Sequence, residues 1–377
     1  LNQKAKGVRN QLWTRKCPDN IAWQKFRRGF SAQQKVAQQV AWDRTRFRDA
    51  CTQAAKDLRE TFGVLQPISV WETRDCFRDL SRSAGANYSG VKKKSEMPMD
   101  DVLRARKELL EGTFNLPFNV AFRTQIRRRQ AKRRVILVAP GPLAFLEKIF
   151  AYPLQTAMER TSCSKWWATG WDWFASGGAQ TSRFTDGECV SLDFETFDLC
   201  RPAWLTWEIF MALKSLFNLS PQESRLFDAI AKYHCRSPFS YRGQVSWFMG
   251  GLRTGSSFTH VDGTFMARCL LTYIMGEVDS LHYGDDLLVL TNKSVKEIAD
   301  KFAQSTSFVI SRSKSHRGVT WLGYRYSSGK WLVEDHWKRW AQIFMPPKPS
   351  PLRARLQAAF LNSGSDPIMR SELRTIL

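Results

Sequence analysis

Hydrophobic residues recur three and four positions apart along several stretches of the chain, as in a helix with one buried face. This spacing predicts helices over residues 32–58, 99–112, 143–158, 201–217, 221–235, 258–275 and 294–304. Other short stretches are continuously apolar or alternate between apolar and polar residues, as strands do. The two patterns occur together along the chain, so we expect both helices and strands.

The strand patterns gather in the second half of the chain. Residues 188–194, ECVSLDF, alternate and end in an acid, and residues 280–290, SLHYGDDLLVL, form two apolar runs around a tight acidic turn. Further strands are predicted at 135–139, 243–249 and 307–311, with a hairpin at 319–333. The candidate acids and glycines therefore fall in one unit of strands and helices at 186–340, with basic material upstream.

The charge balance points to a polyanionic partner. The 377 residues contain 57 Lys and Arg against 35 Asp and Glu, which gives a formal net charge of +22. Such an excess favours nucleic acid first and an anionic membrane surface second. Hydrophobic residues at 43% and aromatic residues at 13% exclude a disordered chain. No stretch has about 18 uncharged apolar residues, so we expect no membrane span.

The cysteines and the first residues carry less information. Eight cysteines are scattered along the chain and none forms a C-x-x-C pair, so neither a zinc ribbon nor a redox motif is indicated. Reduced thiols in a cytosolic protein are the expectation. The chain begins LNQKAKGVRN, without a Met or a hydrophobic signal core, which indicates a fragment or a processed product.

An adjacent pair of acids stands at the acidic turn. Tyr283-Gly284-Asp285-Asp286 is flanked by apolar residues on both sides. Two neighbouring carboxylates between apolar strands are costly unless something neutralises them, and oxygen ligands of this kind suit a divalent metal. An ordinary solvated turn remains the alternative, because Gly-Asp is common in hairpins.

A second group of acids follows the strand at 188–192. Asp193 ends that strand and Asp198 lies five residues further on. Carboxylates from two strands that hold two metal ions are what in-line phosphoryl transfer requires. The alternatives are a helix N-cap for Asp193 and a solvated charge for Asp198.

A Gly/Ser loop opens the helix predicted at 258–275. Its sequence, Arg253-Thr254-Gly255-Ser256-Ser257-Phe258-Thr259, offers backbone N–H groups and hydroxyls to a phosphate or a ribose. A flexible loop with a simple N-cap would look similar.

Taken in chain order, these elements resemble the palm motifs of viral RNA-directed RNA polymerases. The acids at 193–198 resemble motif A, the loop at 253–259 motif B, and Gly284-Asp285-Asp286 motif C. Four more stretches match in the family's order: Ser83 to Glu96 as motif G, residues 123–136 as motif F, residues 311–314 as motif D, and residues 321–324 as motif E. Among subfamilies the chain looks most like the partitivirus enzymes, with picobirnavirus-like enzymes as the nearest rival.

The resemblance implies roles for individual residues. Asp193, Asp285 and Asp286 would be catalytic and would ligate two Mg²⁺ or Mn²⁺ ions, and Lys314 would be the general acid for pyrophosphate. The implied nucleotide-binding residues are Asp198, Arg123, Lys132, Arg134, Gly255, Ser256 and Thr259. One departure concerns the position four residues after Thr259, where many relatives have Asn and this chain has Gly263. Asp262 or Thr264 is the candidate replacement.

The implied fold is α+β, a right-hand polymerase with fingers, an antiparallel-sheet palm and a partial thumb. The fingers would span 1–185, with the loop where the template enters at 81–96 and the basic arm at 123–136. Palm segments at 186–200 and 243–335 would flank a fingers insertion at 201–242, and 336–377 would be a truncated thumb.

The implied function is template-directed synthesis of a viral RNA genome, double-stranded in this subfamily, with release of pyrophosphate. The implied partners are RNA template and product, ribonucleoside triphosphates and, as a further candidate, a viral capsid protein. The implied location is the virion interior or the host cytoplasm. A reverse transcriptase and a catalytically inactive palm-like RNA-binding protein are the alternatives, against which Gly284 and the intact acids respectively argue.

Overall fold

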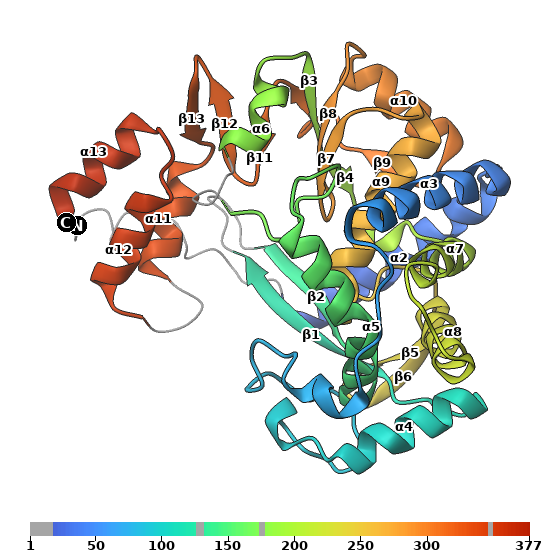
Figure 1. Ribbon diagram of the computed structural model, residues 1–377. Helices are drawn as coiled ribbons and strands as arrows, with labels where there is room; N and C mark the ends of the chain where they lie inside the picture. Colours follow the sequence, from blue (N-terminus) through green and yellow to red (C-terminus); the bar gives the residue numbers. More distant parts are fainter. Residues whose placement is uncertain (1–17, 126–131, 173–177, 346–349) are drawn as a thin grey trace.

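A computed structural model of the chain describes residues 18–125, 132–172, 178–345 and 350–377 (Figure 1). Two four-stranded sheets, a ring of helices and a separate C-terminal group of strands and helices make up this part of the chain. The mixture of helices with largely antiparallel sheets confirms the predicted α+β class.

The first sheet joins two segments that lie more than a hundred residues apart in sequence. Its strand order is β2-β1-β5-β6, with antiparallel pairs β1–β2 and β5–β6 and a short parallel pair β1–β5. The strands are β1 (Phe118–Gln125), β2 (Lys132–Val138), β5 (Arg236–Tyr241) and β6 (Gln244–Met249). The sequence predicted strands only at 135–139 and 243–249 and missed β1 and β5.

Proline explains why β5 was hard to predict. Pro238 has no N–H to donate, and proline is usually excluded from central strands. Here β1 pairs with β5 only at Phe239 and Ser240, so Pro238 lies just outside that pairing. The predicted domain boundary between residues 242 and 243 falls in the turn of the β5–β6 hairpin, where Arg242 and Gly243 both have positive φ.

The second sheet carries the acids singled out in the sequence. Its order is β10-β3-β8-β7, and its neighbouring strands are antiparallel. The strands are β3 (Cys189–Leu192), β7 (Ser280–Tyr283), β8 (Asp286–Leu290) and β10 (His316–Arg317). Val190 and Leu287 pack into the main core on one face, and Leu281 and Leu288 pack with Trp321 on the other. Because both faces are covered, Leu287 to Leu290 of β8 are apolar without a break, and the polar Ser280 and His282 of β7 are buried with a hydrogen bond between them.

Helices pack around both sheets (Figure 1). They are α2 (Asp19–Gln39), α3 (Arg44–Phe62), α4 (Met99–Glu111), α5 (Gly141–Arg160), α6 (Gly178–Thr185), α7 (Ala203–Lys214), α8 (Pro221–Cys235), α9 (Thr259–Met275) and α10 (Val295–Ser305). The predicted helices at 99–112, 143–158, 201–217, 221–235, 258–275 and 294–304 agree with α4, α5, α7, α8, α9 and α10 within a few residues. Nearly every residue of α9 is buried, so this helix lies in the centre of the molecule.

The single helical stretch predicted at 32–58 is wrong, because the chain breaks it into α2 and α3. Asp43 accepts a hydrogen bond from the Arg46 N–H and starts the second helix. Trp42, in the break, packs against Phe47, Trp204 and Tyr273. The hydrophobic period continues through the break, so periodicity alone could not reveal it.

Short elements complete the main body. They are the 3₁₀ turns η1 (Val70–Arg74), η2 (Lys94–Glu96) and η4 (Phe197–Leu199), and a small sheet of β4 (Phe194–Glu195) with β9 (Val309–Ile310). No helix in the described ranges is both long enough and apolar enough to cross a membrane. Every cysteine within these ranges is free, and Cys17 lies outside them.

The C-terminal group has a hydrophobic core of its own, and it lies at one side of the molecule (Figure 1). It consists of β11 (Thr320–Trp321), β12 (Tyr324–Ser327), β13 (Lys330–Val333), α11 (His336–Phe344), α12 (Leu352–Leu361) and α13 (Pro367–Ile376). Tyr324, Trp340, Leu356 and Leu373 are among its buried residues. The strands confirm the predicted hairpin at 319–333, whereas α13 was not predicted.

Candidate active site

The pairing of β3 with β8 brings the two acidic stretches together. Leu192 is opposite Leu287, so Asp193, one residue beyond Leu192, faces the position of Asp286. Asp285 lies in the tight turn between β7 and β8, where Tyr283 pairs with Asp286. Gly284 has a φ of +64°, a backbone conformation that glycine adopts without strain. Carboxylates more than ninety residues apart in sequence therefore meet at one end of the sheet.

These three carboxylates line a cavity of about 720 Å³. Arg134 from β2 and Lys314 from the loop before β10 line the same cavity, so cations and acids share it. The far wall comes from the C-terminal group. Its lining residues there are Leu322, Gly323, Glu334, Asp335, Lys338, Arg339 and Gln342.

Asp193 is tied to the loop that carries Lys314. The Lys314 Nζ lies 2.5 Å from Asp193 Oδ1. The Asp193 N–H donates to Ser315 Oγ at 3.0 Å, and its carbonyl accepts from the Ser311 N–H at 2.8 Å. Both side chains of the Asp193–Lys314 pair remain partly exposed, at 34% and 51%. A partly exposed lysine of this kind can leave the carboxylate when another cation arrives.

The remaining two carboxylates resist ionisation. Burial among the atoms of the turn, followed by the charges of Asp285 and Asp193, raises the pKa of Asp286 to about 7. Burial and the charge of Asp193 also raise the pKa of Asp285, against the opposing effects of Arg134 and Lys314. Their side chains still reach the cavity, so protein surrounds them without closing them off from solvent. A cation among the three acids would relieve this repulsion.

Helix α9 supports the acidic turn through a hydrogen bond and close packing. Thr264 Oγ1 accepts a hydrogen bond of 2.9 Å from the Gly284 N–H and donates to the His260 carbonyl. Gly263 lies against the turn, since a Cβ built on it would be 4.0 Å from the Gly284 Cα. His260 stacks near Tyr283, with 4.4 Å between ring centroids. Thr264 was one candidate to replace the Asn that many relatives carry, and in the structure its hydroxyl hydrogen-bonds the acidic turn.

The other candidate replacement, Asp262, points away from the cavity. Its carboxylate lies 2.6 Å from the Arg201 guanidinium, and both side chains are 1% exposed. A buried residue that is already paired in this way cannot hydrogen-bond a ribose in the cavity.

The Gly/Ser loop packs against the end of β2. Gly255 forms a bridge with Val138, and a Cβ on Gly255 would lie 1.9 Å from the Leu137 carbonyl oxygen, so only glycine fits. Thr254 Oγ1 accepts from the Leu137 N–H at 3.2 Å. The Ser256 hydroxyl accepts from the Phe258 N–H, and the Thr259 hydroxyl donates to the Arg253 and Ser256 carbonyls. The loop is therefore closely bonded rather than loose: the Ser256 and Thr259 hydroxyls have partners within it, and the Thr254 hydroxyl has its partner in β2.

The basic arm presents alternate residues to opposite sides of its strand. Arg133 donates to Asp19 on α2 at 2.9 Å, while the next residue, Arg134, lines the cavity. Arg123 is exposed and pairs with Arg134 across the β1–β2 ladder. The Lys132 backbone belongs to β2, but its side chain lies outside the described residues, as does the arm at 126–131. Of the predicted cations of this arm, the structure places Arg134 in the cavity.

The loop at 81–96 lies beside the end of the same strand. Gly85 has positive φ, and a Cβ there would be 2.1 Å from the Ala139 carbonyl oxygen. Asp101 of α4 accepts from both the N–H and the hydroxyl of Ser89, and the Gly141 N–H donates to the Ala86 carbonyl. Loop, strand and α5 therefore form one bonded corner.

Not every predicted residue reaches the carboxylates. Asp198 is exposed on η4 and does not line the cavity, although its carbonyl accepts from the Leu252 N–H. Gly255, Ser256 and Thr259 stand behind β2 and likewise do not line it. Sequence reasoning missed Glu334, Lys338 and Arg339, which only the folding of the C-terminal group brings to the cavity wall. No local pattern marks these three residues.

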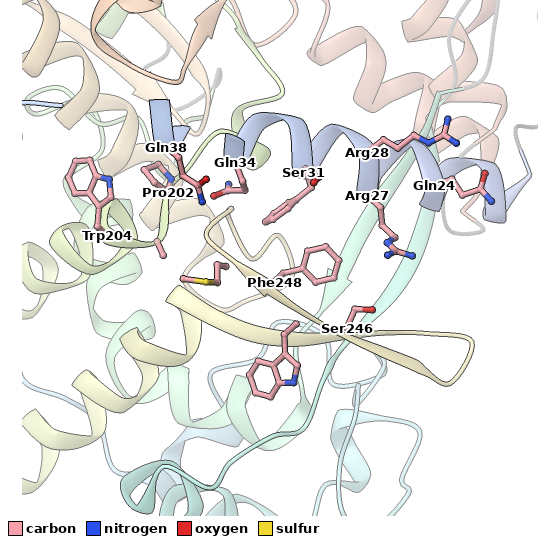
Figure 2. Close-up of a pocket in the computed structure, with 14 residues that line it drawn as sticks. Gln24, Arg27, Arg28, Ser31, Gln34, Gln38, Pro202, Trp204, Ser246 and Phe248 are labelled. Atoms are coloured by element: carbon pink, nitrogen blue, oxygen red, sulfur yellow. The ribbon is translucent and has the colours of Figure 1, made fainter. Parts of the chain in front are cut away.

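A second, larger cavity lies away from the acids (Figure 2). Its volume is about 780 Å³, and it opens between α2 and β6, with the start of α7 at one end. Arg27 points from α2 into this space in Figure 2, and Phe248 points up from β6. None of the predicted site residues whose side chains the structure describes lines it.

The side chains at the acidic cavity offer the type of ligand that a divalent metal ion prefers. Three carboxylates provide oxygen ligands, which Mg²⁺ and Mn²⁺ prefer. Across the described ranges no group of three His, Cys, Asp or Glu side chains is already gathered closely enough to hold an ion. To bind a metal ion, Asp193 would have to release Lys314. The raised pKa of Asp286 reflects its burial and the neighbouring charges of Asp285 and Asp193, which a metal ion would neutralise.

The sequence of this chain is similar to known viral polymerases. The sequence model of the viral RNA-dependent RNA polymerase family matches residues 78–345. The RNA-directed RNA polymerase of Cryptosporidium parvum virus 1 (strain KSU-1) is 26% identical over 224 residues, which are 55% of this chain and 41% of that protein. The chain thus spans about two fifths of the length of this curated relative.

Solved polymerase structures share the fold. The RNA-dependent RNA polymerase of a human picobirnavirus aligns with 98% of this chain and 78% of its own, with a TM-score of 0.69 and 15% identity. The Sicinivirus 3Dpol polymerase aligns with 86% of this chain and 79% of its own, again with a TM-score of 0.69, at 17% identity. These likenesses confirm the predicted right-hand polymerase fold.

Proposed function

The chain belongs to the family of viral RNA-dependent RNA polymerases, and we propose that it catalyses template-directed synthesis of RNA. The observation that carries the proposal is the meeting of Asp193 with Asp285 and Asp286 in one cavity, beside Arg134 and Lys314. Carboxylates for metal on one side and cations for a triphosphate on the other are what nucleotidyl transfer requires.

Asp193, Asp285 and Asp286 would hold the divalent metal on which polymerases of this family depend, as two Mg²⁺ or Mn²⁺ ions. Once bound, such ions supply an activated attacking hydroxyl and charge neutralisation at the triphosphate. The chain's own residues do the rest. Arg134 would bind the triphosphate, with Arg123 and Lys132 supporting it from the same arm.

The reaction joins the 3′ hydroxyl oxygen of the growing RNA to the α-phosphorus of a ribonucleoside triphosphate. The bond from that phosphorus to the β-phosphate oxygen breaks, the hydroxyl gives its proton to solvent water, and pyrophosphate leaves. Lys314 would give a proton to the leaving pyrophosphate, which requires that it first release Asp193. Asp198 would contact the ribose, and Gly255, Ser256 and Thr259 would shape the pocket from behind β2.

The subdomains follow from the same assignment. We place fingers at 1–185 and at 201–249, palm at 186–200 and 250–335, and a short thumb at 336–377. The insertion ends at 249 rather than 242 because β5 and β6 form one hairpin in the sheet that carries the basic arm. Helix α11 of the C-terminal group, with Lys338, Arg339 and Gln342, would form the thumb side of the cavity.

RNA template, RNA product and ribonucleoside triphosphates are the proposed partners. A viral genome replicated in this way, double-stranded in the partitivirus-like group, would place the enzyme in the virion interior or the host cytoplasm. A capsid protein is a further proposed partner. The choice between partitivirus-like and picobirnavirus-like relationship stays a prediction.

A synthesis assay tests the proposal. The purified chain, a single-stranded RNA template and Mg²⁺ or Mn²⁺ should incorporate ribonucleotides and release pyrophosphate in equal amounts. Preference for deoxyribonucleotides would favour a reverse transcriptase instead. Tight RNA binding with no metal-dependent incorporation would indicate the inactive RNA-binding alternative. Asp285→Ala should abolish synthesis and leave RNA binding intact.

A further inference from the structure

A buried acid–histidine pair lies under the Gly/Ser loop. The Glu147 side chain of α5 is 0% exposed and the His234 side chain of α8 is 2% exposed. Glu147 Oε1 lies 2.7 Å from His234 Nε2. Phe118, Phe210 and Phe258 surround the imidazole ring, with centroid separations of 6.3, 4.8 and 6.3 Å. Such a pair in an aromatic surrounding is costly to bury, so its second contact is informative.

That second contact is with the loop. Glu147 Oε2 accepts a hydrogen bond of 2.7 Å from the backbone N–H of Ser257. The Ser257 hydroxyl donates to the Ala144 carbonyl one turn earlier on α5, at 3.0 Å. His234 Nε2 also lies 3.5 Å from Ser256 Oγ. A carboxylate only accepts hydrogen bonds, so both of its oxygens are filled, one by the ring and one by the loop.

The loop is fixed on its other side by β2. Gly255 and Thr254 bond to the strand at Val138 and Leu137, as described above. The same strand presents Arg134 to the cavity three residues earlier. Helix α9, which the loop opens, holds the acidic turn through Thr264 and Gly284. The loop therefore connects the strand of the basic arm with the support of the acids.

We propose that Glu147, oriented by His234, is a positioning residue that clamps the loop 254–259 and so sets the spacing between Arg134 and the acidic turn. The positioning role rests on the proposed polymerase function, whereas the clamp itself does not. Loss of the Glu147 side chain should free the loop and weaken the binding of the nucleotide, and it should leave the affinity for RNA unchanged.

Amide hydrogen exchange of the full chain tests the clamp directly. In the unaltered protein the amides of 253–259 should exchange as slowly as those of the neighbouring helices, although this stretch is a loop. Fast exchange there would overturn the clamp without any variant. In Glu147→Ala these amides should exchange on the order of ten- to a hundredfold faster, because a hydrogen bond to a charged group is lost.

Matched variants separate the clamp from general damage. Glu159→Ala removes another carboxylate from the same helix. Glu159 lies 2.6 Å from Arg78 and does not contact the loop, so this variant should leave the exchange of the loop amides unchanged. Glu147→Gln keeps an oxygen for the Ser257 N–H, so exchange should rise no more than about threefold. His234→Leu keeps the bulk but removes the ring's donor, and it should release the loop although Glu147 is intact. If Glu147→Ala and Glu159→Ala change exchange equally, the clamp is overturned.

Nucleotide kinetics test the positioning role. Glu147→Ala should raise KM for ribonucleotides roughly tenfold or more, with RNA affinity within about twofold of the unaltered chain, and Glu147→Gln should restore KM. A released loop with unchanged KM and kcat would overturn the positioning role. If the unaltered chain makes no RNA, the polymerase proposal fails by itself, and the exchange measurements still decide the clamp.

Discussion

Two kinds of acid in this molecule differ in how far water and partners can reach them. Asp193 is 34% exposed and is held by a half-exposed lysine, and Asp285 and Asp286 face the same open cavity. Glu147 and Asp262 are almost fully buried, and each has a fixed partner, His234 and Arg201 respectively. An open site permits exchange of one cation for another, whereas a closed site permits only the partner built into it. This difference supports the proposal that the open acids take part in the chemistry and that the closed ones support the structure.

The largest effect on RNA synthesis is expected from a substitution at the open acids. Asp285→Ala should reduce RNA synthesis by roughly a thousandfold or more, because a carboxylate at the reacting centre is lost. Its stability should change little, since the loss of the attraction to Arg134 and Lys314 is offset by the removal of repulsion among the three acids. Steady-state incorporation and chemical unfolding measure the two quantities. Asp279→Ala, at the other end of β7, is the control and should keep full activity.

A similar change in the closed region should do the reverse. Asp262→Ala leaves the Arg201 guanidinium buried without its carboxylate, which should lower the free energy of unfolding by about 3–5 kcal/mol. Urea denaturation checks this value. The exposed pair Arg312–Asp300 provides the comparison, and Asp300→Ala should cost no more than about 1 kcal/mol. Equal losses in the two variants would contradict the distinction between open and closed acids.

The contact of the Gly/Ser loop with β2 should respond to a single methyl group. In Gly255→Ala the new Cβ meets the Leu137 carbonyl oxygen, so backbone must move at a cost of about 1–3 kcal/mol. Gly29→Ala in α2 is the matched control, because its Cβ would meet only Leu199 at an ordinary 3.5 Å. Helix propensity should even stabilise that control by up to about 1 kcal/mol. Unfolding curves of both variants decide the point.

The smallest effect concerns the C-terminal group and pH. Burial opposes ionisation of Asp366, but the N–H groups of Met369 and Val333 and the His336 ring outweigh it and lower its pKa. A lowered pKa adds stability above the unfolded value of about 4, and this stability is lost as pH falls through the folded value. The protection factors of the α13 amides, corrected for the intrinsic exchange rate at each pH, should therefore fall below about pH 4. Asp366→Asn should weaken this acid-dependent step by about 1 kcal/mol, and an unchanged pH profile would contradict the assignment.

The sequence was most informative where chemistry needs unusual residues side by side. Asp285 and Asp286 after Gly284 are rare between apolar strands, and the register of β3 with β8 confirmed that Asp193 joins them. Arg134 was also predicted and does line the cavity. By contrast, Asp198, Ser256 and Thr259 do not line it, and their roles stay predictions. The prediction that Asp262 could contact the ribose was wrong, because Arg201, far away in the sequence, pairs with it in the core.

Several features had no local signal. Glu147 lies in a helix of apolar residues, and nothing near it in the sequence indicates that His234 and Ser257 will reach it. The break between α2 and α3 was hidden because the apolar period runs through it. Strand β5 was hidden by Pro238, which the sheet tolerates because pairing with β1 starts one residue later.

Local patterns thus determined most of the helices, the acidic turn, the basic arm and the glycine-bearing loop, since these depend on neighbours a few residues away. Tertiary structure alone decided which acids stay open and which are sealed, and which cations face them. Burial and partners come from segments that are tens to hundreds of residues distant, as with Arg201 and Asp262 or Lys314 and Asp193. A carboxylate can exchange its partner in an open cavity but keeps a fixed partner in a closed core, because access to water sets whether that partner can be replaced.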